Sequence, residues 1–197
     1  MSTFTPYTVE VLQRMRIDAG HRFLDLGTGP GVSLALAAAL TGPGRAFGVE
    51  RDEQMAAFAQ KSLDRVGVGA RVVTGDALDG HAPQAPFDQI HSGIGVPCLP
   101  KTWVDQLAPG GRLLTTLATR TPSWPGHCLV TRTTGGRVEA VLEGGPLCCV
   151  PERAIIVGAQ RVDCHGFENF DGSTINPSLD NIHAISATVV AECFRSH

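Results

Sequence analysis

The chain has 197 residues with a formal net charge of −3, and 43% of its residues are hydrophobic against 18% charged. This length and composition predict one globular domain with a full core, with room for an appendage. No basic run suggests a nucleic-acid partner, no apolar run is long enough to span a bilayer, and no signal peptide is recognisable at the N-terminus.

Strands and helices alternate along the first part of the chain. The predicted helices cover residues 5–15, 32–40, 52–66 and 100–107, and the predicted strands cover 22–26, 45–50, 70–74, 87–92 and 112–118. Segments 127–134 and 137–143 flank Gly135-Gly136 and predict a hairpin. We therefore expect an α/β fold with a doubly wound, mostly parallel seven-stranded sheet that ends in an antiparallel hairpin.

The last part of the chain has a different pattern. Residues 155–157 are apolar, 163–180 are mostly polar, and 185–190 form a second apolar run. We expect residues 1–151 to form one domain. Residues 152–197 are expected to be a C-terminal extension, an added hairpin or strand pair packed on the same domain.

A glycine-rich turn after the first predicted strand is the most informative motif. The apolar strand runs into Asp25, glycines follow at positions 27, 29 and 31, and an Ala/Leu-rich helix begins at once. Glycines after a strand let the backbone turn sharply and let a ligand approach without meeting a Cβ atom. The free amides at the helix start favour an anionic group of that ligand.

The spacing of this motif favours S-adenosylmethionine over a dinucleotide. In the dinucleotide motif G-x-G-x-x-G the third glycine would fall at position 32, which is Val32 here. A carboxylate at Asp25 suits an ammonium or sulfonium group better than a pyrophosphate. An acid followed by G-x-G-x-G resembles the first motif of class I S-adenosylmethionine-dependent methyltransferases, which are Rossmann-like. The resemblance implies cofactor contacts from Asp25, Gly27, Thr28, Gly29 and Gly31.

Two more acids follow the next two predicted strands. Glu50 ends the second strand, where a carboxylate accepts hydrogen bonds from ribose hydroxyls, and Arg51 is expected on the same rim. Asp76 follows the third strand. In class I methyltransferases an acid here accepts from the adenine amino group, and the next amide, that of Ala77, meets a ring nitrogen.

Two longer stretches carry a narrower resemblance. Residues 87–100 (FDQIHSGIGVPCLP) and 105–113 (DQLAPGGRL) are similar, without a gap, to protein-L-isoaspartate O-methyltransferases. Val150-Pro151 matches the Val-Pro that follows the hairpin in that family, so the resemblance covers about residues 3–151. It implies carboxyl methylation of aspartate or isoaspartate in a peptide or protein, with S-adenosylhomocysteine as the second product.

Two departures from the family pattern fall on the substrate side. The chain starts almost at the substrate-holding motif, with Thr5 or Thr3 in the place of its usual serine, and the tail beyond Pro151 is longer. A dedicated peptide in a natural-product pathway is therefore an alternative substrate. Three further functions stay open at this point: a methyltransferase of a small metabolite, a protein that binds the cofactor without turnover, and a nicotinamide-dependent oxidoreductase. Val32 and Asp25 argue against the oxidoreductase.

Methyl transfer to a carboxylate needs positioning more than proton transfer. A carboxylate is already ionised at pH 7, so no general base is required. We expect Ser92 and Thr5 to hold the substrate carboxylate. His91 is interpreted as a hydrogen-bonded histidine at the strand end beside the cofactor, in preference to a base.

The six cysteines show no C-x-x-C spacing, which argues against a zinc site. We interpret them as reduced thiols and expect a cytoplasmic protein without a metal. The expected partners are a peptide or protein that carries aspartate or isoaspartate, without nucleic acid or membrane. The sequence does not predict the oligomeric state.

Overall fold

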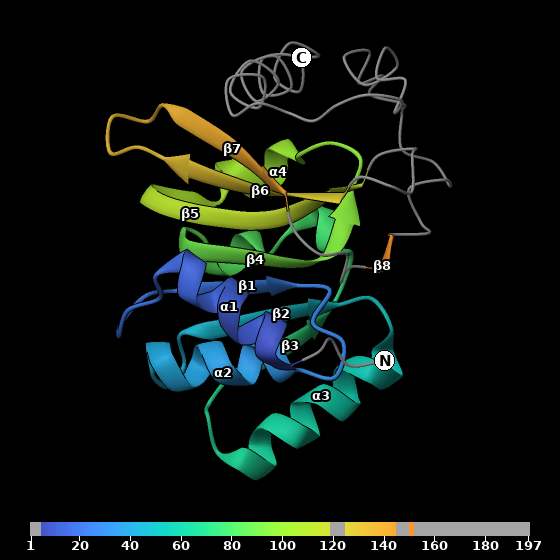
Figure 1. The fold of residues 1–197 in the computed structure, drawn as a ribbon. Coiled ribbons are helices and arrows are strands. Elements are labelled where there is room, and N and C mark those ends of the chain that lie inside the picture. The colour runs from blue at the N-terminus through green and yellow to red at the C-terminus, as the bar shows by residue number, and fades with distance from the viewer. Residues whose placement is uncertain (1–4, 119–124, 145–149, 152–197) are drawn as a thin grey trace.

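The computed structural model describes residues 5–118, 125–144 and 150–151, and all structural statements below concern these residues (Figure 1). The proposed extension, residues 152–197, lies outside them. The helices are α1 (Thr5–Met15), α2 (Val32–Thr41), α3 (Glu53–Val66) and α4 (Lys101–Asp105), with two 3₁₀ turns, η1 (Ala77–Asp79) and η2 (Ala82–Gln84). The strands are β1 (Phe23–Leu26), β2 (Ala46–Glu50), β3 (Arg71–Thr74), β4 (Phe87–Val96), β5 (Leu107–Ala118), β6 (Pro125–Arg132), β7 (Val138–Gly144) and β8 (Val150–Pro151).

The strands form one sheet in the order β3-β2-β1-β4-β5-β6-β7, and β8 pairs with β4 outside this path. Strands β1 to β5 run parallel, whereas β6 and β7 form an antiparallel hairpin on β5. This confirms the predicted doubly wound sheet with its hairpin. The short strand β8 was not predicted; it lies parallel to Ile94 and Gly95 of β4.

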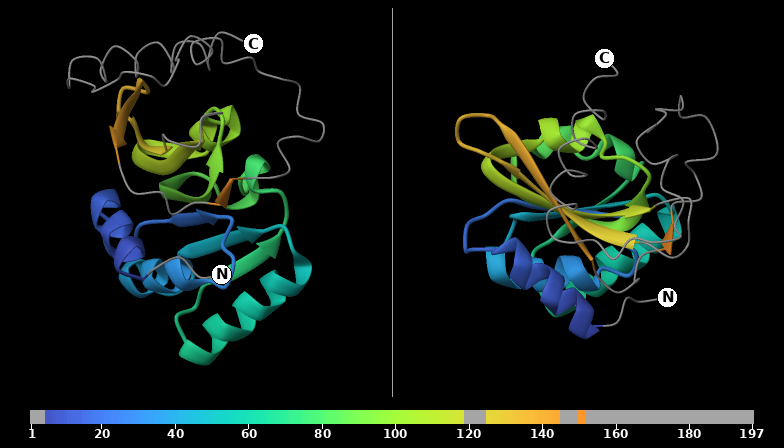
Figure 2. Two further views of the ribbon diagram at one scale, coloured as in Figure 1. Left: turned by 45° about the vertical axis from the view of Figure 1, so that its right-hand side comes forward. Right: turned by 45° about the horizontal axis from the view of Figure 1, so that its top comes forward.

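Apolar side chains pack on both faces of the sheet. Phe23 packs with residues of α1 and α2 in one core cluster, while its neighbour Leu24 packs with Trp103 of α4 in the other. Successive side chains of a strand point to opposite faces, so the two clusters lie on opposite sides of the sheet. Figures 1 and 2 show α1 and α2 side by side on one of these faces.

Local sequence explains where the helices near the carboxyl edge of the sheet begin. The Asp52 carboxylate caps α3 by accepting hydrogen bonds from the amides of Gln54 (2.8 Å) and Met55 (3.0 Å). Helix α2 begins after Gly31, which has a φ of 89° and provides no side-chain cap. The start of α2 therefore leaves its first amides without a side-chain acceptor from the capping position.

The predicted bounds of the fifth strand are wrong. The sequence predicted a strand that begins at residue 112, after the turn-forming residues Pro109-Gly110-Gly111, but β5 begins earlier, at Leu107. Leu107 pairs with Phe87, and the register then shifts before Gln89 pairs with Arg112. The turn signal thus marks an irregularity inside the strand pair, which local sequence does not distinguish from a loop.

Candidate active site

Three carboxylates lie at the carboxyl ends of three adjacent parallel strands. Asp25 is in β1, Glu50 is the last residue of β2, and Asp76 follows β3. Asp25 is level with Gly48 of β2, and Glu50 is level with Thr74 of β3. The three acids thus lie where the sequence placed them along the strands, at the edge where ligands bind in open α/β sheets.

Asp25 is held inside the protein. Its side chain is 1% exposed. One carboxylate oxygen, Oδ2, accepts a hydrogen bond from Ser33 Oγ at 2.6 Å, and Oδ1 accepts one from His91 Nδ1 at 2.7 Å. The carboxylate thus presents almost no surface of its own, and Ser33 and His91 connect it to the edge of the sheet.

Glu50 ties the glycine-rich turn to the start of α3. Its Oε2 accepts from the amide of Gly29 at 2.8 Å, and its Oε1 accepts from the amide of Asp52 at 3.0 Å. A carboxylate oxygen can accept more than one hydrogen bond. Glu50 therefore fixes the turn and keeps acceptor capacity for the two hydroxyls of a ribose.

Glycine is required at different positions of the turn for different structural reasons. Gly27, Gly29 and Gly31 all have positive φ, at 73°, 54° and 89°. A Cβ atom on Gly27 would lie 2.6 Å from Ile94 Cγ2, whereas one on Gly29 would have nothing within 4 Å. Gly29 is thus the position where the backbone faces open space, as a closely approaching ligand requires.

Thr28 does not face this open space. Its side chain is buried, and its hydroxyl donates to the Asp25 carbonyl at 3.0 Å. The hydroxyl also lies against Gly48, where a Cβ atom would be only 2.4 Å from Thr28 Oγ1. The predicted contribution of Thr28 to the cofactor site is therefore limited to its backbone and to holding the turn.

Asp76 and Ala77 lie on the neighbouring 3₁₀ turn. Asp76 is exposed and caps η1 by accepting from the amide of Leu78 through Oδ1, at 2.9 Å. Its other carboxylate oxygen has no partner among the residues that the structure describes. Ala77 is buried. Arg51, also expected on this rim, is exposed beside Glu50.

The part of β4 that contains Ser92, which was expected to hold the substrate carboxylate, lies directly on the glycine-rich turn. Between His91 and Gly95, β4 bulges away from β5, and a Cβ atom on Gly93 would lie 3.1 Å from the carbonyl oxygen of Gly27. Ser92 is buried, and its hydroxyl donates to the Ile94 carbonyl at 3.0 Å. In this conformation Ser92 stabilises the bulge, so holding a substrate with its hydroxyl would require that bond to be exchanged.

Thr5 is the first residue of α1, and its side chain lies outside the described part. Ser33 was missed, although a hydroxyl in the first helical turn after the glycine motif is a recognisable signal. The pairing of β8 with Ile94 and Gly95 was also not predicted, although its Val-Pro dipeptide belongs to the family resemblance. Among the described residues, no group of three or more His, Cys, Asp or Glu is placed to hold a metal ion.

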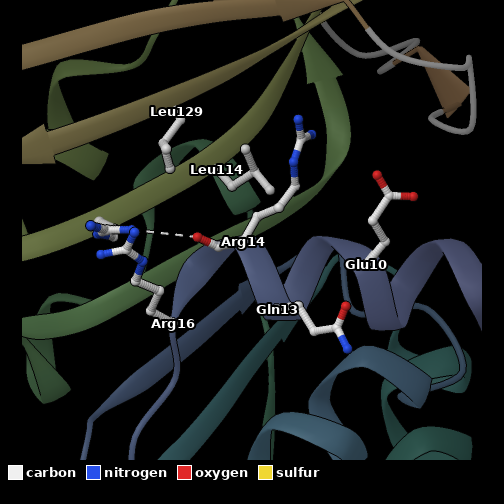
Figure 3. Close-up of a pocket in the computed structure, with 7 residues that line it drawn as sticks. Glu10, Gln13, Arg14, Arg16, Leu114 and Leu129 are labelled. Carbon is white, nitrogen blue, oxygen red and sulfur yellow. Dashed lines mark hydrogen bonds between the residues drawn. The ribbon is translucent and has the colours of Figure 1, made fainter.

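A hollow of about 430 Å³ lies elsewhere, between α1 and the β5–β6 part of the sheet (Figure 3). Arg14 donates to Nδ1 of His127 at 3.0 Å, and Arg112 donates to the Arg14 carbonyl at 3.4 Å. None of the predicted site residues lines it, so we do not assign it to the cofactor. Its lining residues are Glu10, Gln13, Arg14, Arg16, Arg112, Leu114 and Leu129.

Comparison with known proteins agrees with this geometry. A family model described as protein-L-isoaspartate(D-aspartate) O-methyltransferase matches residues 3–122. A protein-L-isoaspartate O-methyltransferase of Methanoculleus marisnigri is 39% identical over 153 residues, which are 74% of this chain and 64% of that protein. One of Thermococcus onnurineus is 38% identical over 112 residues, 55% of this chain and 50% of that protein.

The chain therefore spans between half and two thirds of the length of these relatives. Among solved structures, a protein-L-isoaspartate O-methyltransferase superposes with a TM-score of 0.67 at 22% identity, covering 73% of this chain and 46% of that one. The protein-L-isoaspartate O-methyltransferase-like protein from Plasmodium falciparum, solved with S-adenosylhomocysteine, superposes with a TM-score of 0.58 at 18% identity. The match covers 75% of this chain and 72% of that one. At these identities the structural likeness establishes the fold. Within the part of the chain described here, no helix has the length and apolar character needed to cross a membrane.

Proposed function

Because this chain belongs to the protein-L-isoaspartate(D-aspartate) O-methyltransferase family, we propose that it transfers a methyl group from S-adenosylmethionine to the carboxylate of an isoaspartyl residue in a peptide or protein. The observation that carries the proposal is the position of Asp25, Glu50 and Asp76 at the carboxyl ends of three adjacent strands, with Glu50 hydrogen-bonded to the glycine-rich turn. The relatives do not bear out a natural-product pathway, because the curated ones are named for isoaspartate.

The residues at this edge fit an adenosyl cofactor. Glu50 has acceptor capacity for ribose hydroxyls, and Asp76 is exposed on the next strand end, where it would accept from the adenine amino group. At Gly29 a Cβ atom would have nothing within 4 Å, so the backbone there is open to a ligand. Asp25 is buried, so it would act on the amino-acid end of the cofactor through Ser33 and His91, which bind its two carboxylate oxygens. When bound, the cofactor supplies an electrophilic methyl group.

The protein's part in the reaction is mainly positioning. An isoaspartyl carboxylate is ionised near pH 7 and needs no base to become a nucleophile. Placing it about 3 Å from the methyl carbon, opposite the sulfur, supplies most of the catalysis. His91 Nδ1 is occupied by Asp25, which agrees with a positioning role. The β4 bulge at residues 92–94 is proposed to form the wall against which the substrate rests.

Methyl transfer tests the proposal directly. The full chain is incubated with methyl-labelled S-adenosylmethionine and either an isoaspartyl peptide or the same peptide with normal aspartate. We expect base-labile label in the isoaspartyl peptide only, and at least about tenfold less with E50Q, because Glu50 is proposed to hold the ribose. Label on neither peptide, with S-adenosylhomocysteine binding intact, would favour a small metabolite or a non-catalytic binding role instead.

The remaining expectations stay proposals. We propose a cytoplasmic location, in keeping with the interpretation of the six cysteines of the sequence as reduced thiols. We also propose that residues 1–151 form the methyltransferase domain and that 152–197 extend it. Limited proteolysis that leaves a stable fragment ending near residue 151 would support this division.

A further inference from the structure

Helix α4 contacts the loop that follows Asp76. We propose that Trp103, Thr102 and Gln106, from α4 and its C-cap, are positioning residues that set the orientation of Asp76 and so determine the preference of the site for adenine. This inference rests on the proposed function, since it concerns how the same site recognises its cofactor. It assigns a role to three side chains that do not themselves face the ligand.

The central contact is a chain of two hydrogen bonds through one peptide unit. Trp103 is fully buried, and its Nε1 donates to the Ala77 carbonyl at 2.7 Å. The amide of the same peptide unit, that of Leu78, donates to Asp76 Oδ1 at 2.9 Å. A peptide unit is planar, so fixing its carbonyl also fixes its N–H direction. Trp103 thereby orients the group that holds one oxygen of the Asp76 carboxylate.

Two further side chains fix the rest of the loop. Thr102 Oγ1 donates to the Leu78 carbonyl at 2.5 Å. Gln106 spans the loop, with Nε2 donating to the Asp79 carbonyl at 2.8 Å and Oε1 accepting from the His81 amide at 2.7 Å. Three successive carbonyls are thus bound by α4 and its C-cap.

Gly80 makes this close approach possible. Its φ is 66°, and a Cβ atom there would lie 2.5 Å from Gln106 Oε1. Gln106 is itself only 8% exposed, so loss of these partners would leave buried polar groups unsatisfied. The loop and the helix are therefore fitted to each other, while the side chains of Asp76 and Asp79 in the loop stay exposed.

Binding of a cofactor analogue separates positioning from general stability. S-inosylhomocysteine carries a carbonyl where S-adenosylhomocysteine carries the adenine amino group, so it lacks the donor that Asp76 would accept. We expect the wild type to prefer S-adenosylhomocysteine by at least about tenfold in Kd, and D76N to lose most of this preference. T102V and Q106L should reduce it about threefold or more, while binding of the inosyl analogue changes little.

The control is K101Q, which removes an exposed ion pair with Asp105 on the same helix but touches no loop carbonyl. It should keep the wild-type preference. T102V is nearly isosteric at an exposed position and keeps the test valid if Q106L fails to fold. A double variant, D76N/T102V, should lose no more preference than D76N alone, because both act on the same contact.

Two outcomes would overturn the inference. If D76N loses the preference but folded T102V and Q106L keep it, α4 only stabilises the fold and the proposed function stands. If the wild type binds neither compound, the proposed function fails and the inference fails with it.

Discussion

His91 Nδ1 lies 2.7 Å from Asp25 Oδ1, although 66 residues separate the two in sequence. They are register partners on the adjacent parallel strands β4 and β1. Side chains at matched positions of neighbouring strands lie on the same face, so the strand register itself brings the imidazole to the carboxylate. The pair connects strand β1, which leads into the glycine-rich turn, to the β4 bulge that is proposed to form the substrate wall.

The role of His91 is tested by H91N. Because Nδ1 is occupied by Asp25 and a carboxylate substrate needs no base, we expect kcat to fall less than about tenfold, with the KM for S-adenosylmethionine rising. The shape of the kcat profile between pH 6 and 8 should not change. If His91 were a general base, H91N would instead lower kcat by a factor of about 10²–10⁴.

Substitution of Asp25 should affect both stability and binding. In D25N an amide replaces a carboxylate that accepts from Ser33 and His91, so the hydroxyl or the imidazole must change from donor to acceptor or lose its partner. We expect the free energy of unfolding to fall by about 1–3 kcal/mol and the affinity for S-adenosylhomocysteine to fall at least about tenfold. S33A removes only one donor to Asp25, so urea unfolding should show a smaller loss in the free energy of unfolding than for D25N. Equal stability of D25N and wild type would contradict this account of the buried carboxylate.

The two glycines Gly27 and Gly29 should respond differently to alanine. Both have positive φ, so either substitution costs about 1 kcal/mol in backbone strain. Only in G27A does the new methyl group also meet Ile94, at 2.6 Å. Thermal unfolding should therefore show G27A as the less stable variant. Calorimetry should show G29A as a folded protein with weakened cofactor binding, and unchanged binding by G29A would contradict the proposed approach of the ligand at this position.

His81 should make stability depend on pH. Burial lowers the pKa of His81 below its ordinary value of 6.5, so the folded state favours the neutral imidazole. This contribution is fully present above pH 6.5, the unfolded value, and is lost as the pH falls through the lower folded pKa. We expect the free energy of unfolding to fall less between pH 7 and pH 5 in H81Q than in wild type. The effect should be small because the side chain is partly exposed, and identical slopes would contradict it.

The sequence predicted the features that depend on local pattern. The alternation of apolar strands and helices gave the sheet, and acids at three successive strand ends gave Asp25, Glu50 and Asp76 as neighbours. These predictions succeed because parallel strands of one sheet end at the same edge, whatever the details of packing.

Contacts between segments that are distant in sequence could not be predicted from the local pattern. The Trp103 bond to the Ala77 carbonyl and the pairing of β8 with Ile94 use backbone groups, which every residue possesses, so no residue pattern marks them. Thr28 was expected at the ligand side because it lies in the motif that resembles the cofactor-binding turn of class I methyltransferases. Its hydroxyl turns inward instead, because a carbonyl acceptor and the space beside Gly48 are available there.

Calorimetric titration of the full chain with S-adenosylhomocysteine and, separately, with NAD tests the central claim most directly. The arrangement of Asp25, Glu50 and Asp76 predicts one site for S-adenosylhomocysteine, weakened at least about tenfold in E50Q, and no measurable heat of binding with NAD. Binding of NAD in preference, or no binding of S-adenosylhomocysteine by the folded chain, would contradict it.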